Sequence, residues 1–380
     1  MENHDHTFNK EVLPLRIKID HIDSQILCLL AQRQAQVEKV VKLKKEHHVP
    51  VYHPAREEDL ISKLRLQAGK ANLDPDFMED LYRVILRQSR VKQTGQMEQK
   101  AVKPGARILI IGGAGQMGRF FASLFQKSGY EVRILTRKDW TTAGQLCKDI
   151  DLALISVPID KTYDAIEQIA PFLEPATILA DLTSIKAGPL AKMLKSHPGP
   201  VTGLHPIFGP TSGSLDKQII VVTPGRDRDH SRWLLEQLTL WGAVIVESSA
   251  EEHDEIMEIV QALRHFATFG FGQFLYEKHA RLDRTLEFSS PIYRLELGMV
   301  GRLFAQDSSL YSEIIFATRE RRQLLKDFIS SLNAHLEMLE KNDKKLFNEK
   351  FNRIAKWFGS FSEQAMREST FLINKLIERF

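Results

Sequence analysis

The sequence predicts a chain of three folded parts: an all-α domain, an α/β domain built on a mainly parallel sheet, and a second all-α domain. Three observations predict this order. Apolar residues recur at helical spacing from about residue 13 to about residue 90, a glycine-rich loop follows a short apolar run near residue 113, and a helical pattern with few glycines runs from about residue 250 to the end. The length of 380 residues agrees with several domains, because a single hydrophobic core rarely grows that large.

The composition is typical of a soluble globular protein, with 43% hydrophobic and 27% charged residues. The net charge of +3 is small, so charge gives no reason to expect a nucleic-acid or membrane partner. The N-terminus has no apolar signal core, and Cys28 and Cys147 are expected to be reduced thiols, so we expect a cytoplasmic protein. The triplet His4-Asp5-His6 has metal-ligand chemistry, but a flexible terminus would not hold it, and we predict no metal site.

The first part is predicted to be an all-α dimer. Its apolar stripe includes Ile19, Ile22, Ile26, Leu29 and Leu30. The helix that this stripe predicts is about thirty residues long, which is more than one small domain can cover, so a partner chain is expected to bury it. Two prolines interrupt the pattern between residues 47 and 57, and a third helix is predicted to open at Asp74–Pro75.

The domain boundaries follow from composition. Residues 92–106 are polar and contain glycine and proline, which indicates a linker. We therefore expect a helical domain at 1–95, a linker at 96–106, a dinucleotide-binding domain at 107–249 and a helical domain at 250–380.

A glycine motif predicts the cofactor. Gly113, Gly115 and Gly118 satisfy the G-x-G-x-x-G pattern between an apolar strand and an amphipathic helix, the context that a Rossmann fold requires. Such glycines let the backbone approach a pyrophosphate at the helix N-terminus, where Gln116 and Met117 stand. We predict a nicotinamide dinucleotide site; the alternative is a glycine-rich turn without a ligand.

The end of the second strand leaves the choice of dinucleotide open. An NAD site usually carries an acidic residue there for the ribose 2′-hydroxyl, about twenty residues after the glycines. This sequence has Arg137 and Lys138 instead, with Asp139 only afterwards. Cations suit a 2′-phosphate, so NADP is predicted to be tolerated; the alternative is that both are solvated turn residues.

Short apolar runs alternating with helical segments predict the rest of the sheet, at LALISVP, TILADL, VTGLHP and IIVVTP. One of them leads into GLHPIFGP, in which prolines stiffen the backbone on both sides of His205. Such a backbone suits a loop that aims an imidazole, although a turn with a buried, hydrogen-bonded histidine has the same pattern.

A family resemblance rests on GLHPIFGP together with IGGAGQMG, SVPI, DLTSIK, QALRHFATF and SSPIYRLELGMVGRLFAQD. These segments closely resemble the bifunctional chorismate mutase–prephenate dehydrogenases of enteric-type bacteria, over nearly the whole chain apart from about the first dozen residues. The N-terminal helices resemble an AroQ-type chorismate mutase, which is an intertwined all-α dimer, and the C-terminal helices a dimerisation domain.

The resemblance implies a set of mutase residues. The pericyclic reaction needs cations and hydrogen-bond donors for two carboxylates and an ether oxygen, and no nucleophile. The residues that match the family's site are Arg16, Arg33, Lys44, Arg56, Glu57, Ser89 and Gln93. Glu57, protonated or hydrogen-bonded, would face the ether oxygen. His53 stands where some relatives carry an acidic residue, so the resemblance gives it no role.

For the dehydrogenase, the resemblance makes His205 the group that takes the proton of the ring hydroxyl, and Ser184 the serine that hydrogen-bonds substrate and histidine. Ser156 would lie near the nicotinamide, Arg302 would bind a prephenate carboxylate, and His265 would lie near the substrate ring where tyrosine feedback is sensed. Structural roles are expected for the neighbouring Arg294 and His253, and Lys186 is assigned none.

The implied function is the conversion of chorismate to prephenate, then of prephenate to 4-hydroxyphenylpyruvate with NAD(P)+, in tyrosine biosynthesis, by a homodimer inhibited by L-tyrosine. One alternative is a dehydrogenase whose N-terminal helices only regulate or dimerise. The cations at Arg16, Arg33, Lys44 and Arg56 with Glu57 argue against it, because a dimer contact needs none on a buried face. A second alternative is a dinucleotide sensor without catalytic activity. The presence of both His205 and Ser184 argues against it.

Overall fold

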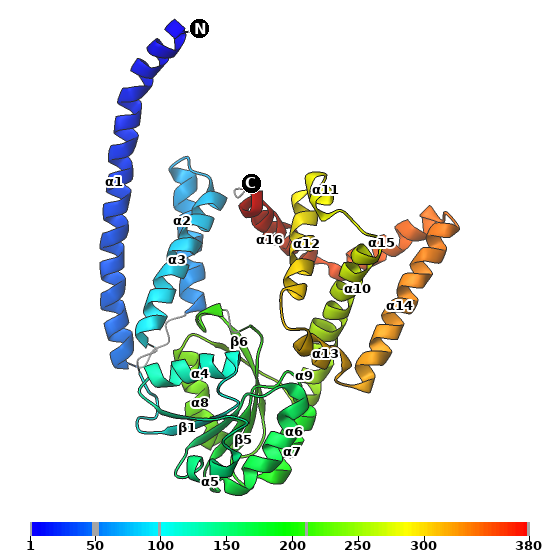
Figure 1. The fold of residues 1–380 in the computed structure, drawn as a ribbon. Coiled ribbons are helices and arrows are strands. Elements are labelled where there is room, and N and C mark those ends of the chain that lie inside the picture. The colour runs from blue at the N-terminus through cyan, green and yellow to red at the C-terminus, as the bar shows by residue number, and fades with distance from the viewer. Residues whose placement is uncertain (1, 48–52, 98–99, 210–211, 378–380) are drawn as a thin grey trace. The chain divides into compact units, whose positions relative to one another are not determined.

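The computed structural model describes residues 2–47, 53–97, 100–209 and 212–377 (Figure 1). The chain folds as two compact units. Unit 1 comprises Met1–Val157, Asp164–Leu182 and Leu190–Ser248, and unit 2 comprises Pro158–Tyr163, Thr183–Pro189 and Ser249–Phe380. The N-terminal helices and the sheet thus belong to one unit, and the C-terminal helices make up most of the other.

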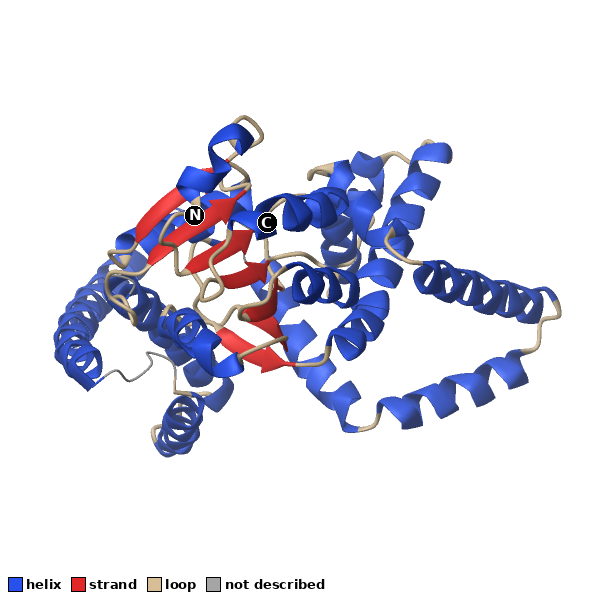
Figure 2. Cartoon of the chain, turned by 90° about the horizontal axis from the view of Figure 1, so that it is seen from below, coloured by secondary structure: helices blue, strands red, loops and turns tan. Residues whose placement is uncertain are grey.

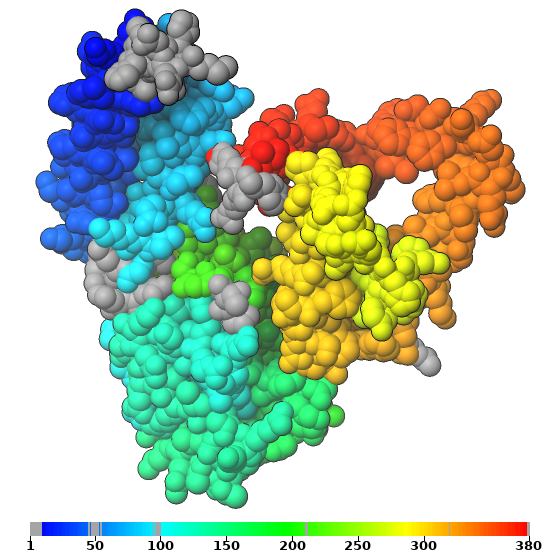
Figure 3. All heavy atoms as spheres, turned by 45° about the horizontal axis from the view of Figure 1, so that its top comes forward, coloured from blue at the N-terminus to red at the C-terminus, as the bar shows by residue number. Residues whose placement is uncertain are grey.

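Three long helices open unit 1: α1 (Glu2–His47), α2 (Pro54–Lys70) and α3 (Pro75–Met97). Prolines stand at the first positions of α2 and α3, where no intrahelical N–H is needed. The Nδ1 atom of His53 accepts from the Arg56 N–H and caps α2. α3 packs against both other helices, and Figure 3 shows the dark-blue α1 lying along them.

Two expectations for this region were wrong. α1 is 46 residues long and begins at Glu2, where the sequence suggested a flexible terminus and a shorter helix; the side chains of His4, Asp5 and His6 lie outside the described ones. α3 continues to Met97, into the segment 92–106 that we expected to be a linker. Both extensions are mainly polar and carry no apolar periodicity, so the pattern did not predict them.

In the part of the chain that the structure describes, seven strands form one sheet in the order β2-β1-β3-β4-β5-β6-β7. The strands are β1 (Arg107–Ile111), β2 (Glu131–Leu135), β3 (Leu152–Ile155), β4 (Ile178–Asp181), β5 (Val201–Pro206), β6 (Ile219–Pro224) and β7 (Val244–Glu247). All neighbours are parallel except β5 and β6, which are antiparallel. From β1, the chain places β2 on one side and β3 on the other, so the order of the strands changes direction there. Doubly wound sheets bind their ligands at such a point.

Helices cover both faces of the sheet (Figures 1 and 2). They are α4 (Gln116–Lys127), α5 (Ala143–Leu146), α6 (Thr162–Ile169), α7 (Ala187–Ser196) and α8 (Arg228–Leu240). Phe121 and Phe125 of α4 and Trp241 after α8 share one buried cluster with Ile108 and Ile110 of β1. β1, β3 and β4 are almost wholly buried, which explains their continuous apolar sequences.

Unit 2 is helical, as the sequence predicted. Its helices are α9 (Ala250–Met257), α10 (Arg264–Glu277), α11 (Leu282–Glu287), α12 (Pro291–Phe304), α13 (Ser308–Phe316), α14 (Arg319–Glu340), α15 (Lys344–Phe358) and α16 (Ser360–Ile377), with a π-helical turn at Glu258–Leu263. Figure 3 shows open space between the C-terminal helices, in orange, and the yellow helices of the same unit. No helix among the described residues is long and apolar enough to cross a membrane.

Candidate active sites

The glycine loop between β1 and α4 leaves no room for side chains. A Cβ on Gly118 would lie 2.7 Å from the carbonyl oxygen of Gly112 and 2.7 Å from the Cα of Gly113. A Cβ on Gly113 would lie 2.9 Å from the Ile134 side chain. Gly115 is the N-cap of α4 and provides no capping side chain, so the first N–H groups of the helix face the loop. This is the cradle that a pyrophosphate needs.

Gly112 is a loop residue that the motif did not single out. Its φ is +79°, and a Cβ there would lie 2.3 Å from the Ser156 carbonyl oxygen. The loop is closed by a hydrogen bond from the Gly115 N–H to the Gly112 carbonyl, 2.9 Å. Gln116 and Met117, predicted to contact the cofactor, form the first turn of α4, and Met117 also packs against the core.

The turn after β2 places cations where the ribose acid of an NAD site is expected. Asp139 is engaged locally, because its carboxylate accepts from the Thr136 N–H at 2.8 Å and from the Thr136 hydroxyl at 2.6 Å. These hydrogen bonds lower the pKa of Asp139. Arg137 and Lys138 are exposed.

The carboxyl ends of β1, β3, β4 and β5 meet at one edge of the sheet, because these strands are parallel. Ser156 follows β3 at this edge and is half-buried, and its N–H donates to Ile111 at 2.8 Å. His205 is the last residue but one of β5, opposite Val221 of β6, and it is buried. It therefore lies in a strand and not in a loop, so the sheet itself fixes its backbone.

Ser184 comes three residues after β4 and belongs to unit 2, with a half-buried side chain. Near it in the chain, the backbone N–H groups of Lys186 and Ala187 donate to the Asp254 carboxylate at 2.7 and 2.9 Å. Burial alone would raise the pKa of Asp254, but these donors and the His253 imidazole at 2.8 Å hold it below its usual value. His253 is thus part of a buried structural network.

His265 of α10 is buried and packs edge-on against the Tyr311 ring, with 4.7 Å between the ring centroids. Its Nε2 accepts from the Arg264 guanidinium at 3.2 Å, and its Nδ1 is buried without a hydrogen-bond partner among the described residues. Burial and the charge of Arg264 lower the pKa of His265 to about 4, so the ring is neutral near pH 7.

Arg302 and Arg294 lie on α12 and differ in their surroundings. The Arg294 guanidinium donates to the Leu286 carbonyl at 2.7 Å and so ties α12 to the end of α11. Arg302 is exposed in the last turn of α12, and its guanidinium forms no ion pair with any described carboxylate. Of the two, Arg302 is the better placed to bind a carboxylate from solution.

A second polar cluster lies on α1, α2 and α3. Arg33 donates to the hydroxyl of Ser89 at 2.9 Å, and that hydroxyl donates to the Ile85 carbonyl. Glu57 accepts from the Arg90 Nη1 at 2.6 and 2.7 Å and from the Lys217 Nζ at 3.4 Å. Lys44 is half-buried: burial lowers its pKa, and the nearby charge of Glu57 opposes that shift.

The cluster contains most of the predicted residues of the helical site. Arg33 contacts Ser89, and Lys44 lies near the charge of Glu57; Gln93 follows one turn after Ser89 on α3. Arg56 is exposed, and its guanidinium pairs with Asp59 at 3.0 Å. Arg16 stands on α1, seventeen residues before Arg33 and so about 25 Å from it along the helix. One chain therefore does not place both arginines in one pocket.

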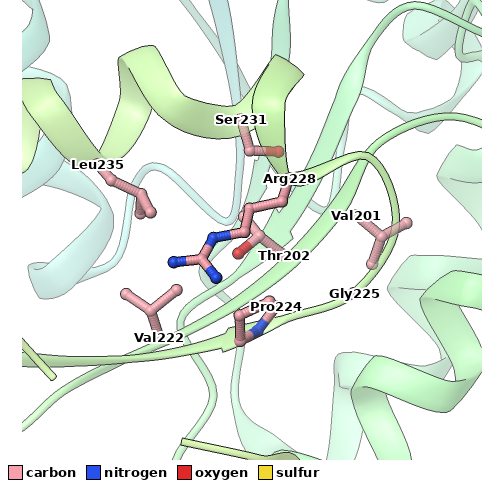
Figure 4. A pocket seen from close by; sticks show the side chains of 8 residues that line it. All are labelled: Val201, Thr202, Val222, Pro224, Gly225, Arg228, Ser231 and Leu235. Atoms are coloured by element: carbon pink, nitrogen blue, oxygen red, sulfur yellow. The ribbon is translucent and has the colours of Figure 1, made fainter. Parts of the chain in front are cut away.

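A small cavity at the amino end of β5 carries none of these residues. It measures about 10 Å³ and is lined by Val201, Thr202, Val222, Pro224, Gly225, Arg228, Ser231 and Leu235. Figure 4 shows the Arg228 side chain among the lining residues. Its volume holds about one water molecule, and it lies at the opposite end of β5 from His205, so it belongs to neither site.

The sequence matches three family descriptions in succession. Residues 15–94 match chorismate mutase type II, residues 131–247 match the nucleotide-binding domain of prephenate dehydrogenase, and residues 249–353 match its dimerisation domain. The T-protein of Enterobacter agglomerans is 43% identical over 364 residues, which cover 96% of this chain and 97% of the relative. That of Haemophilus influenzae is 40% identical, covering 97% and 98%.

A solved structure has the same fold in the dehydrogenase part. It is the prephenate dehydrogenase of Aquifex aeolicus in complex with hydroxyphenyl propionate and NAD+, with a TM-score of 0.55 and 18% identity, covering 68% of this chain and 99% of the other. The family matches and the two T-proteins confirm the fold class, the two activities and the nicotinamide cofactor predicted from the sequence. The chain belongs to the family of bifunctional chorismate mutase–prephenate dehydrogenases.

Proposed function

We propose that the two reactions depend on two separate sets of residues: a mutase set on the N-terminal helices, and a dehydrogenase set drawn from the dinucleotide-binding domain and from the C-terminal domain. The observation that carries this proposal is that Arg33, Lys44 and Glu57 are half-buried and paired, Arg33 with the buried Ser89 and Lys44 with the charge of Glu57. A module that only dimerised would gain nothing from cations there, because burying charge is costly.

At the helical site, chorismate rearranges to prephenate without any covalent bond to the protein. Arg33 and Lys44 bind the substrate's carboxylates and its polarised ether oxygen, and Glu57 hydrogen-bonds near that oxygen. The bond from Arg33 to Ser89 holds the guanidinium in place before substrate arrives, which reduces the entropy lost on binding. Ser89 and Gln93 supply the remaining polar contacts.

The site requires a second copy of the chain. Arg16 is too far from Arg33 along α1 to reach the same pocket, so it serves the pocket of a partner. The apolar stripe of α1 supports this arrangement: the exposed fraction is 55% for Ile19, 52% for Ile22 and 49% for Ile26. In unit 2, Phe351 and Trp357 of α15 are 61% and 80% exposed, and a second copy would cover them as well. The protein is therefore a homodimer through both helical parts.

At the dehydrogenase site, the glycine loop and the first turn of α4 hold the pyrophosphate of the dinucleotide, through Gly113, Gly115, Gly118, Gln116 and Met117. Ser156 lies toward the nicotinamide. When bound, that cofactor accepts a hydride from the substrate ring while carbon dioxide leaves. His205, as a neutral imidazole, takes the proton of the ring hydroxyl, and Ser184 hydrogen-bonds the same part of the substrate. Arg302 binds a carboxylate of prephenate.

We also propose that L-tyrosine inhibits through His265. Tyrosine has the same para-substituted ring as the product. The buried Nδ1 of His265, which has no hydrogen-bond partner among the described residues, could form a hydrogen bond with such a ligand. We propose a cytoplasmic location as well, because Cys28 and Cys147 are free and a reducing compartment keeps cysteines as thiols.

Kinetics on two variants test the dehydrogenase assignments. A base that takes up charge as the reaction proceeds acts mainly in the transition state, so His205→Asn should lower kcat by about 10²–10⁴-fold with little change in KM. Arg302 contacts a carboxylate present throughout, so Arg302→Ala should raise the KM for prephenate far more than it lowers kcat. A His205→Asn enzyme with near-normal kcat would remove His205 from the mechanism.

A further inference from the structure

One buried ion-pair network joins the helical site to the sheet. The Arg90 Nη1 contacts both oxygens of Glu57 at 2.6 and 2.7 Å, and its Nε contacts the Oδ2 of Asp216 at 3.2 Å. The Lys217 Nζ reaches Glu57 at 3.4 Å. The exposed fraction of the side chain is 9% for Arg90, 13% for Glu57 and 7% for Asp216. All four residues belong to unit 1, although Asp216 and Lys217 come from the segment between β5 and β6.

The turn that carries Asp216 and Lys217 is firmly anchored. Leu215 is fully buried in the core of the sheet, and the Gln218 N–H closes the turn on the Leu215 carbonyl at 2.9 Å. Lys217 has a φ of +58°, a left-handed conformation that costs a residue with a side chain about 1 kcal/mol or more. Its N–H donates to the Gly242 carbonyl at 2.9 Å, which helps to hold it there. The turn thus presents its two charges in a fixed position.

The planar geometry of arginine makes the network directional. Because the guanidinium donors are rigidly related, fixing Nε on Asp216 sets the direction in which Nη1 meets Glu57. The two ion pairs of Arg90 are also too buried to count as ordinary surface contacts, so removing one partner would leave an uncompensated charge; Lys217, by contrast, is 37% exposed. The Oδ1 of Asp216 is buried without a hydrogen-bond partner among the described residues, so Arg90 is the main compensation for this carboxylate.

We propose that Arg90 is a positioning residue for Glu57, and that Asp216 and Lys217 of the dinucleotide-binding domain complete the mutase site by holding this pair in place. The inference rests on the proposed role of Glu57. It means that the mutase helices are not an independent module: the helical domain without the sheet would have a less ordered Glu57.

The test uses Asp216→Asn in the full-length protein. This change keeps the side chain's shape and removes its charge, so Arg90 is no longer held from the sheet side. We expect kcat for chorismate to fall about tenfold with KM changed less than twofold, because Glu57 acts in the transition state. Prephenate oxidation should be unchanged. A matched control is Asp229→Asn, which removes an exposed carboxylate paired with Arg232 in the same domain and should alter neither activity.

A double-mutant cycle separates positioning from general loosening of the fold. If Asp216 acts through Arg90, Asp216→Asn should have no further effect on the mutase kcat in an Arg90→Gln background. Additive effects, or equal losses of both activities, would overturn the proposal. Should Asp216→Asn not fold, Lys217→Asn replaces it, because asparagine tolerates the left-handed backbone while removing the contact to Glu57. We expect a several-fold lower mutase kcat for that variant, and an unchanged value would overturn the proposal.

Glu57→Gln, measured in parallel, distinguishes the two levels of the argument. If Glu57→Gln retains full mutase activity, the proposed mutase site itself is wrong. If Glu57→Gln is inactive while Asp216→Asn behaves as the parent enzyme, the site stands and only the contribution of the sheet domain is refuted.

Discussion

Arg33 and Ser89 lie 56 residues apart in the chain, yet the Arg33 Nη1 donates to the Ser89 Oγ at 2.9 Å and so joins α1 to α3. Ser89 is almost fully buried, and its hydroxyl also donates to the Ile85 carbonyl at 2.9 Å. The hydroxyl has a single hydrogen, which it donates to the Ile85 carbonyl, so it can only accept from Arg33. The packing of the helices therefore fixes the direction from which the guanidinium donates.

This bond predicts the effect of Ser89→Ala. Losing a hydrogen bond to a charged group costs about 1.5–3 kcal/mol, so the KM for chorismate should rise about tenfold or more while prephenate oxidation is unaffected. Steady-state assays of both activities measure this. An unchanged KM would show that Arg33 is oriented by other contacts.

The glycine loop predicts a selective loss of cofactor binding. In Gly118→Ala the new Cβ meets backbone atoms at 2.7 Å, which cannot move aside as a side chain can. We expect the KM for the dinucleotide to rise at least about tenfold and the melting temperature to fall. Gly69→Ala is the control, because nothing lies within 4 Å of its Cβ. Equal behaviour of the two variants would contradict the tight cradle.

The turn after β2 predicts the cofactor preference of Arg137→Asp. The change replaces an exposed cation with a charge that repels a 2′-phosphate and can accept from a 2′-hydroxyl. The ratio of kcat/KM for NADP to that for NAD should fall about tenfold or more. Lys195→Asp makes the same charge change on α7 and should leave the ratio unaltered. A constant ratio in Arg137→Asp would show that Arg137 faces only solvent.

The lowered pKa of His265 predicts how stability depends on pH. The folded protein binds a proton there only near pH 4, whereas the unfolded chain binds it near the ordinary value of 6.5. Stability should therefore fall as the pH drops from about 6.5 toward 4. Buried His197, whose pKa is also lowered by burial, acts in the same direction.

Melting temperatures at pH 7 and pH 5 check this. On acidification, the melting temperature of the parent protein should fall by about 2 °C or more beyond the fall seen in His265→Gln. A control variant at an exposed histidine, His230→Gln, should behave as the parent. An identical loss in the parent and in His265→Gln would mean that His265 does not titrate differently on folding.

Local patterns predicted much of the architecture because the relevant physics is local. The run before Gly113 is apolar because β1 is buried on both faces, and the stripe of α1 repeats at helical spacing. The glycines are demanded by contacts within a few residues, apart from the approach of Ile134 and Ser156. The antiparallel pairing of β5 with β6 agrees with the connection between them, because its described residues, 207–209 and 212–218, form no α-helix such as a parallel crossover usually needs.

The rest depends on pairs that are distant in sequence. Arg90 and Asp216 are 126 residues apart, and each alone resembles a solvated charge. Their burial follows from how α3 meets the turn before β6, which no periodicity encodes. His53 shows the opposite case: its role as the N-cap of α2 could have been predicted from the proline that follows it and from the helix start.

Two variants, one in each set of residues, test whether one chain holds two separate sites. Both activities are measured on Lys44→Ala and on His205→Asn, with chorismate and with prephenate plus the dinucleotide. We expect opposite losses: Lys44→Ala should abolish chorismate consumption and oxidise prephenate normally, whereas His205→Asn should rearrange chorismate normally and lose its dehydrogenase kcat. Parallel loss of both activities in either variant, with the fold intact, would contradict it.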